Sequence, residues 1–207
     1  MCRNSETRRN FPCSAFVLAG GKSSRMGRDK AFLLFQGKPL IQQAVTLASH
    51  FAKDIRIIGT PEKSELGKLG IQVISDLVSP NGPISGIVTA LRSTSNFLNL
   101  IVACDMPRIP VSFIELLFEN ADGADAVLFK SNSGQVEPLC ALYTTNCLPL
   151  FNLNFRLEKY GIPDSLKELC VNHISEEDLW SRGLQADIFR SINTPKDFAE
   201  LLNESSG

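Results

Sequence analysis

The residues best suited to chemistry stand close together at positions 18–30, in the stretch LAGGKSSRMGRDK. Adjacent glycines behind an apolar run leave backbone amides exposed, and the basic side chains bring positive charge to the same place. A nest of N–H groups with nearby Lys and Arg is well suited to hold a polyphosphate. The stretch therefore predicts a phosphate-binding loop. The alternative is a glycine turn whose basic side chains are merely solvated.

Two common phosphate-binding patterns do not fit this stretch. The dinucleotide pattern G-x-G-x-x-G fails because the glycines are Gly20, Gly21 and Gly27. The Walker pattern fails because its first glycine would have to stand at position 16, which is Phe16. A dehydrogenase and a P-loop enzyme are therefore both disfavoured.

Two carboxylates follow apolar runs farther along the chain. Asp76 comes after the run 71–75, and Asp105 ends the run 98–105. Mg²⁺ in nucleotide sites prefers one or two carboxylates together with phosphate oxygens and water. Asp105 is therefore a candidate metal ligand, and an Asp that only starts a turn is the alternative at both positions. His50 and His173 are expected to be ordinary surface histidines.

The elements that must position these residues alternate along the first two thirds of the chain. Apolar runs rich in Val, Ile and Phe predict strands, and segments with apolar residues at helical spacing predict helices. The alternation predicts an α/β protein of Rossmann-like, three-layer type, with a mostly parallel open sheet and helices on both faces. Its ligands would bind beyond the carboxyl ends of the strands. The predicted strands are 14–20, 54–59, 71–75, 98–105 and 124–129, and the predicted helices are 39–52, 83–93 and 110–121.

The pattern changes after about residue 134. The segment 135–145 reads as a strand that Pro138 interrupts, which predicts an edge or bulged strand. Helical segments are expected at 146–159 and within 161–170. The segment 187–204 is expected to form a strand and then a helix, which Thr194 caps with Pro195 at its first position. Residues 14–207 are interpreted as one domain after a flexible leader, 1–13.

Composition excludes several classes of protein. The 207 residues are 43% hydrophobic and 21% charged, with a net charge of −1, so no overall field attracts nucleic acid or a membrane surface. The six cysteines are scattered without metal-binding spacing, which fits a reducing compartment. No apolar run approaches the ~20 residues of a membrane span. We expect a cytoplasmic protein.

The stretch 18–30 resembles the signature of the molybdenum cofactor guanylyltransferases, the MobA family of nucleotidyltransferases. Further blocks resemble that family in the same order: SDLVSPNGPISGIVTAL (75–91), VACDMPRIP (102–110), VEPLCALY (136–143) and SINTPKDFAEL (191–201). Together they span residues 16 to about 202. Related sugar-nucleotide and cytidylyl enzymes usually carry Ala where this chain has Gly21, which favours the guanylyl branch.

The resemblance implies that GMP passes from GTP to the phosphate of molybdopterin, with release of pyrophosphate and with Mg²⁺ as cofactor. We expect a monomer that makes transient contacts with other proteins of cofactor biosynthesis. The resemblance also assigns roles to residues of this sequence. Arg25 and Lys30 would be catalytic, Asp105 would hold the metal, and Asn193 would approach the pterin phosphate or the metal. The residues implied to contact the nucleotide are Leu18, Ala19, Gly20, Gly21, Lys30, Asp76, Gly82 and Asp105.

One departure from the family bears on the second substrate. Where the family often carries an Arg before the Ser-Leu pair, this chain has Pro163 and Asp164, so Lys159 or Lys167 would have to replace that Arg. A transferase that uses CTP or a different phosphorylated acceptor therefore stays open. A nucleotide-binding module without catalysis is the alternative of another class.

Overall fold

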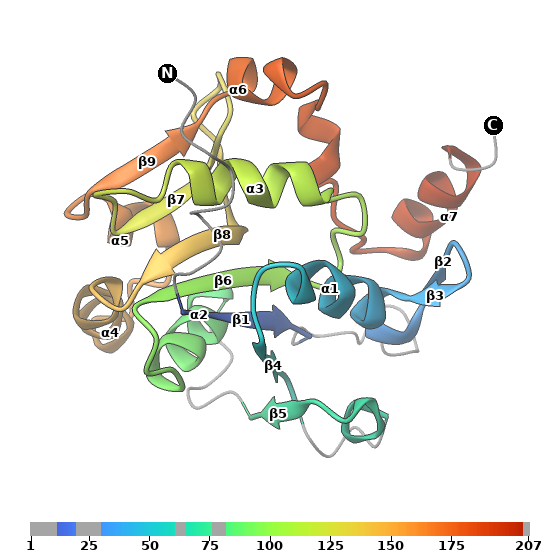
Figure 1. Cartoon of the computed structure of the whole chain (residues 1–207), viewed down its shortest axis with the longest axis horizontal. Helices are drawn as coiled ribbons and strands as arrows, with labels where there is room; N and C mark the ends of the chain where they lie inside the picture. Colours follow the sequence, from blue (N-terminus) through green and yellow to red (C-terminus); the bar gives the residue numbers. More distant parts are fainter. Residues whose placement is uncertain (1–11, 20–29, 61–64, 76–81, 205–207) are drawn as a thin grey trace.

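A computed structural model describes residues 12–19, 30–60, 65–75 and 82–204 of the chain. In these residues a seven-stranded sheet runs in the order β5-β4-β1-β6-β8-β7-β9, and β2 and β3 form a separate two-stranded hairpin (Figure 1). The strands are β1 (Cys13–Leu18), β2 (Leu34–Phe35), β3 (Lys38–Pro39), β4 (Asp54–Ile58), β5 (Gln72–Ile74), β6 (Leu98–Ala103), β7 (Ala126–Lys130), β8 (Val136–Thr144) and β9 (Val171–Ile174).

The sheet is mostly parallel. β1 pairs in parallel with both β4 and β6, β4 pairs in parallel with β5, and β7 pairs in parallel with β9. Only β8 runs against its neighbours among the strands of this sheet that the structure describes. Every residue of β1 is buried, which is expected of a strand covered on both faces of a parallel sheet.

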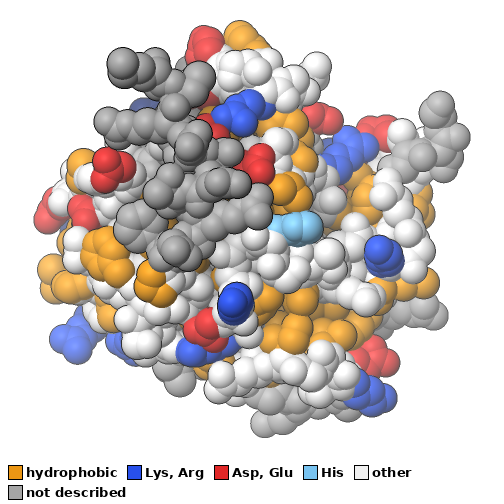
Figure 2. Space-filling model, viewed as in Figure 1, with side chains coloured by type: hydrophobic (Ala, Val, Ile, Leu, Met, Phe, Trp, Pro, Cys, Tyr) orange, Lys and Arg blue, Asp and Glu red, His pale blue; other side chains and the backbone are white. Residues whose placement is uncertain are grey.

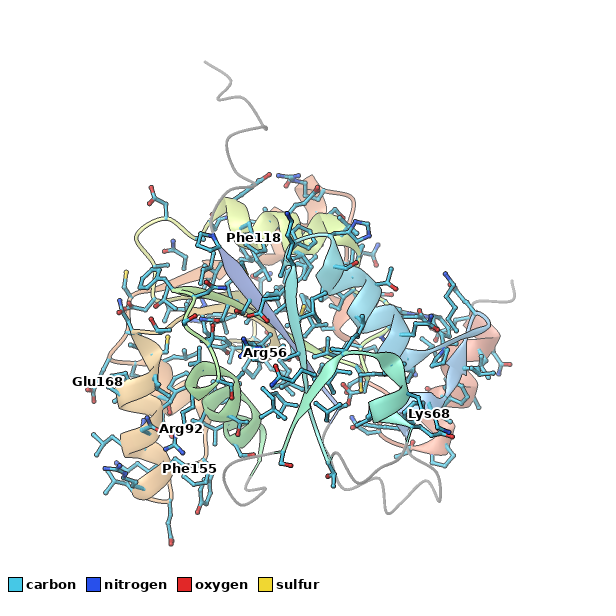
Figure 3. The ribbon with its side chains drawn as sticks, turned by 60° about the horizontal axis from the view of Figure 1, so that its bottom comes forward. Arg56, Lys68, Arg92, Phe118, Phe155 and Glu168 are labelled. Atoms are coloured by element: carbon cyan, nitrogen blue, oxygen red, sulfur yellow. The ribbon has the colours of Figure 1, made fainter. Side chains whose placement is uncertain are left out.

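Helices cover both faces of the sheet, as the alternating pattern predicts. Apolar residues of α1 and α3 join one core, and those of α2, α4 and α5 join the other (Figure 1). On the second face, Arg92 at the end of α2 reaches α4, where it donates hydrogen bonds to Asn152 (Figure 3). The α-helices are α1 (Leu40–Ser49), α2 (Pro83–Arg92), α3 (Val111–Glu119), α4 (Cys147–Arg156), α5 (Ile162–Leu166), α6 (Glu176–Ser181) and α7 (Pro195–Glu204), and the 3-10 helices are η3 (Lys30–Phe32), η4 (Leu66–Leu69) and η5 (Ala186–Phe189).

α2 shows how the sequence pattern produces this packing. Its buried residues Ile84, Ile87, Val88 and Leu91 are spaced three or four positions apart, so they form one apolar stripe along the helix. Burying each such side chain contributes roughly 1.5–3 kcal/mol relative to leaving it in water. The stripe fixes α2 against the sheet and thereby fixes the direction from which its first turn meets the carboxyl ends of the strands.

The C-terminal segment returns to that same edge. The arrows of β1 and β6 point toward the side where the β2–β3 hairpin and α7 lie (Figure 1). Buried side chains of Phe35, Leu40, Ile192 and Leu201 form a small separate core there. This core holds the segment before α7 close to the ends of the central strands.

The segment 135–145, predicted as an edge or bulged strand, is β8, which lies between β6 and β7. The bulged alternative is confirmed, because the β7–β8 register shifts between Val127 and Phe129, and this shift accommodates Pro138 inside the sheet. One prediction about strands is wrong. The start of 187–204 is the 3-10 helix η5 and not a strand, because tight turns direct Ile188 into the core and stack Phe189 on Phe129.

Several elements escaped the sequence interpretation. β9, α6 and the β2–β3 hairpin were not predicted. α6 begins with a capping box in which Ser175 and Asp178 satisfy each other's backbone N–H groups. The five cysteines in the described part of the chain are free thiols. Among the described helices, none is long and apolar enough to span a bilayer.

Candidate functional site at the carboxyl ends of the central strands

The carboxyl ends of the parallel strands are tied into one row. Ala19 N donates to Ile58 O at 2.9 Å, and Cys104 N donates to Leu18 O at 3.1 Å. Gly59 N donates to Ile74 O at 3.0 Å. The residues that directly follow β1, β4 and β6 are therefore neighbours, and a ligand that lies across this row can contact all three connections.

Lys30 and Asp105 meet at the end of β6. The Lys30 ammonium lies 2.5 Å from Asp105 Oδ2, and each of the two side chains is 17% exposed. The same ammonium lies 3.1 Å from the carbonyl oxygen of Ile192 and 3.4 Å from Asn193 Oδ1. Three oxygen atoms from two distant segments thus surround one cation at the protein surface. The carboxylate that pairs with Lys30 lies 75 positions away in the sequence.

The segment before α7 is fixed by its own hydrogen bonds. Ile192 N donates to the carbonyl oxygen of Asp105 at 2.9 Å, which places the two segments side by side. Asp197 accepts the backbone N–H groups of Asn193 and Thr194 at 2.9 and 2.7 Å, and Thr194 Oγ1 accepts from Asp197 N. The predicted cap at Thr194 is confirmed. The N–H of Asn193, followed by that of Thr194, holds the pKa of Asp197 below its usual value.

An ion-pair network anchors the far end of α7. Arg108, three residues after Asp105, donates to Glu204 and to Asp187. Arg190 contacts Glu204 and Glu200 on the same helix. The helix is therefore bound at both ends to the loop that carries Asp105, so Asn193 has little freedom to leave the site.

The other predicted residues divide into two groups. Leu18 ends β1, and Ala19 follows it beside Gly59. Gly82 precedes α2 with φ of +78°, a conformation that favours glycine, and a Cβ there would meet nothing within 4 Å. Gly86 faces Leu18, since its Cβ would lie 3.3 Å from Leu18 Cδ2, so it serves helix packing. Gly20, Gly21, Arg25 and Asp76, and also Lys22 and Arg28, lie outside the described residues.

A cavity of about 360 Å³ lies on one side of Asp105. Its walls include Cys104 and Met106, which flank Asp105 in sequence, together with residues of α1 and the start of α3. Figure 2 looks onto this face of the molecule, where hydrophobic side chains are visible over α1. Lys38 and His50 are the basic residues of the lining, and no carboxylate lines it. A cavity so short of charge is a poor place for a triphosphate with its metal. His50 and His173 are both exposed, as the sequence predicted.

The group at Lys30 fits a divalent cation chemically. Asp105 supplies a carboxylate, and Asn193 and Ile192 supply neutral oxygens around the position that the ammonium now holds. These are the hard ligands that Mg²⁺ prefers. In the described ranges, no group of three or more His, Cys, Asp or Glu residues could hold a metal. An ion at Asp105 would take phosphate oxygens and water as further ligands.

Residues 15–171 match the family model described as the MobA-like NTP transferase domain. The chain belongs to the MobA-like NTP transferase family. A relative from Pelotomaculum thermopropionicum, named a probable molybdenum cofactor guanylyltransferase, is 34% identical over 195 residues. That match covers 92% of this chain and 93% of the relative. Membership of the MobA-like NTP transferase family makes this chain a nucleotidyltransferase.

Solved structures support the same fold. Molybdopterin-guanine dinucleotide biosynthesis protein A from Archaeoglobus fulgidus is 28% identical, with a TM-score of 0.77 over 93% of this chain and 98% of that one. A 4-diphosphocytidyl-2C-methyl-D-erythritol synthase from Anaerococcus prevotii is 12% identical, with a TM-score of 0.73 over 98% and 100% of the two chains. The second likeness shows the fold alone. The nucleotidyltransferase fold predicted from the sequence is confirmed.

Sequence reasoning missed two contributors to this MobA-like site. The carbonyl of Ile192 is a backbone group, and nothing in the sequence shows where a backbone oxygen points. Glu137 was noted only as part of a strand, and the charge of Asp105 is one cause of its raised pKa, after burial. The bulge of β8 next to Glu137 is a signal, because bulges are common next to active sites.

Proposed function

We propose that this protein transfers GMP from GTP to the terminal phosphate of molybdopterin and releases pyrophosphate. The relatives are named for this activity, and the family is that of NTP transferases. The observation that carries the proposal is the contact of Lys30 with Asp105 and Asn193 at the carboxyl ends of the central strands. A nucleotidyl transfer needs a cation, a metal-binding carboxylate and a polar group in one place.

The reaction requires positioning more than proton chemistry. An oxygen of the acceptor phosphate attacks the α-phosphorus of GTP, and the bond from that phosphorus to the bridging oxygen breaks, so that pyrophosphate leaves. Such transfers depend on alignment and on the stabilisation of negative charge. Lys30 supplies a mobile positive charge beside the site, and Arg25 is proposed to supply a second one with a planar fork of donors.

Lys30 has to exchange a partner during this reaction. Its three N–H groups face the oxygens of Asp105, Ile192 and Asn193. To donate to a phosphate oxygen it must leave at least one of them, and the carboxylate of Asp105 then needs another cation. We propose that Asp105, with Asn193 beside it, holds Mg²⁺. When bound, Mg²⁺ supplies charge neutralisation on the triphosphate oxygens.

The nucleotide is proposed to lie along Leu18, Ala19 and Gly82. Gly20, Gly21 and Asp76 are proposed as further contacts, and Gly21 is taken to favour guanine over cytosine. Residues 14–207 are proposed to act as one nucleotidyltransferase domain. That the protein works as a cytoplasmic monomer stays a prediction. Lys167, considered as a substitute for the missing Arg, is exposed and pairs with Asp164 at 2.7 Å, so Lys159 is the better candidate to grip an acceptor phosphate.

The proposal is tested by following pyrophosphate release with Mg²⁺ and each of the four nucleoside triphosphates, with and without molybdopterin. We expect release with GTP alone, and only when molybdopterin is present. Release with CTP would move the protein to the cytidylyl branch. GTP binding without release in the presence of molybdopterin would favour a non-catalytic module. Release with another phosphorylated acceptor in place of molybdopterin would overturn the assignment of the acceptor.

A further inference from the structure

Glu137 stands on β8 at the point where that strand passes the end of β6. The two strands pair in antiparallel register from Leu98 opposite Thr144 to Val102 opposite Cys140. β6 ends at Ala103, two residues before Asp105, and β8 extends past Cys140 to begin at Val136, so Glu137 and Asp105 both lie near the end of β6. A second observation agrees with this placement, since the charge of Asp105 contributes to raising the pKa of Glu137. Glu137 therefore belongs to the same edge as Lys30 and Asp105.

The described residues around Glu137 supply a hydrogen-bond donor to only one of its two carboxylate oxygens. Its side chain is half-buried, and Oε1 accepts the backbone N–H of Leu139 at 2.9 Å. Within the described ranges, Oε2 has no hydrogen-bond partner and no Lys or Arg pairs with the carboxylate. Burial is the main cause of its raised pKa, ahead of the repulsion from Asp105. A carboxylate held in this way is stabilised by any ligand that brings hydrogen-bond donors to it.

The strand order indicates which of the two substrates would lie next to Glu137. β6 lies between β1 and β8, so Leu18 and Ala19 flank Asp105 on one side and Glu137 flanks it on the other. The nucleotide is assigned to the β1 side under the proposed function. The β8 side is then left for the acceptor, whose phosphate must reach the α-phosphorus near Lys30. A second anion would repel that phosphate, so Glu137 faces a neutral part of the acceptor.

We propose that Glu137 is an acceptor-binding residue that accepts hydrogen bonds from neutral N–H groups of the acceptor's ring system. This inference rests on the proposed function and names the part of the acceptor that the site recognises by hydrogen bonds. A reduced pterin carries several ring and amino N–H donors, which match a carboxylate acceptor in geometry and in charge. The alternative, a second carboxylate for the metal, is an outcome of the test.

The test compares Glu137→Gln with the wild-type protein. The variant keeps the size of the side chain and the amide oxygen that Leu139 N needs. Hydrogen bonds to a charged partner are the stronger ones, so we expect the dissociation constant for molybdopterin to rise about tenfold or more. The constant for GTP with Mn²⁺ should change less than about twofold. Glu115→Gln is the matched control, because Glu115 is exposed on α3 and should leave both constants unchanged.

Two further measurements vary the acceptor, and the second of them uses the wild-type protein alone. A simple alkyl phosphate, which lacks ring N–H groups, should bind wild type and Glu137→Gln equally. In the wild-type protein, methylation of the acceptor's ring nitrogens should weaken binding by about tenfold, the scale of one charge-assisted hydrogen bond. Unchanged molybdopterin binding by Glu137→Gln would overturn the inference. Weaker Mn²⁺–GTP binding with unchanged acceptor binding would also overturn it and place Glu137 on the metal.

Failure of this inference is distinguishable from failure of the proposed function. A wild-type protein that releases no pyrophosphate from GTP and molybdopterin contradicts the proposed function. An active wild-type protein whose Glu137→Gln variant binds molybdopterin normally contradicts only the assignment of Glu137.

Discussion

The Lys30 ammonium contacts Asp105 Oδ2 at 2.5 Å, although the two residues lie 75 positions apart in the sequence. One follows the stretch after β1, and the other follows β6, the strand that pairs with β1 in parallel. Parallel pairing brings the carboxyl ends of both strands to one edge of the sheet. The ion pair is thus a consequence of topology, and it marks the place where charge on a phosphate can be balanced.

Replacement of Lys30 should reduce turnover without unfolding the protein. Loss of one positioned donor to a developing charge typically lowers kcat by about 10²–10³, and we expect Lys30→Ala to fall in that range. Lys30→Arg should restore only part of the rate, because the planar guanidinium cannot fill the position of the compact ammonium. Steady-state pyrophosphate release measures both. Lys53→Ala, at an exposed position before β4, is the control, and an equal loss there would remove the special role of Lys30.

Asp105→Asn should abolish turnover through loss of the metal. The amide keeps the shape of the side chain but not its charge, so binding of Mn²⁺ in the presence of GTP should weaken about tenfold or more, since metal ligands of Mg²⁺ sites are few. Electron paramagnetic resonance of free Mn²⁺ reports this binding without any turnover. Asp122→Asn, exposed near the start of β7, should bind Mn²⁺ as the wild type does. Full activity of Asp105→Asn would eliminate the metal assignment.

Gly86 should tolerate no branched side chain. A Cβ at this position would lie 3.3 and 3.4 Å from the two terminal methyl groups of Leu18, so the further methyls of Gly86→Val must displace that residue. Overpacking of this kind costs typically 1–3 kcal/mol. Urea unfolding should show a loss of that size, together with weaker GTP binding because Leu18 leads into the nucleotide site. Gly67→Val is the control, because a Cβ at Gly67 would meet nothing within 4 Å. It should cause neither this loss of stability in urea nor weaker GTP binding.

The cap of α7 should make part of the stability depend on pH. The backbone N–H groups of Asn193 and Thr194 hold the pKa of Asp197 below the ordinary value of about 3.9. A carboxyl with a lowered folded-state pKa stabilises the protein above its unfolded-state pKa. That contribution disappears as the pH falls through the folded-state pKa. Wild type should therefore be more stable than Asp197→Asn at pH 7, and the difference should shrink on acidification below about pH 4.

Unfolding in urea at several pH values measures this difference. The same measurement on Asp187→Asn serves as a comparison for the pH dependence. Asp187 pairs with Arg108, is more exposed than Asp197 and lies outside the cap. A stability difference between wild type and Asp197→Asn that stays constant down to pH 2 would contradict the assigned cap.

Much of the fold was accessible from the sequence because its signals are local. The buried strand β1 is a continuous apolar run, and the stripe of α2 repeats at helical spacing. For β8, Pro138 left an edge strand and a bulged strand open, and the bulge formed with β7 shows which of the two is present. Ile188 and Phe189 suggested a strand by their apolar character, but a tight helical turn lets Phe189 stack on Phe129 and meet Phe113 edge to face.

The site was predictable where one residue follows one strand. Asp105 could be placed because a carboxylate ends an apolar run, whereas Asn193 became a candidate only through the family resemblance of the block 191–201. Their convergence on Lys30 depends on the strand order and on the return of α7, which no local pattern encodes. Glu137 escaped notice for the same reason, since the antiparallel register of β8 against β6 is a tertiary property.

The most direct test of guanylyl transfer follows the fate of the individual phosphates of GTP. Wild-type protein would be incubated with Mg²⁺, molybdopterin and GTP labelled at either the α- or the γ-phosphorus. The α-label should appear in a pterin–guanine dinucleotide and the γ-label in pyrophosphate, with both products formed about 10²–10³-fold more slowly by Lys30→Ala and not formed by Asp105→Asn. Transfer of the γ-label to the pterin, or normal transfer of the α-label by both variants, would contradict the account.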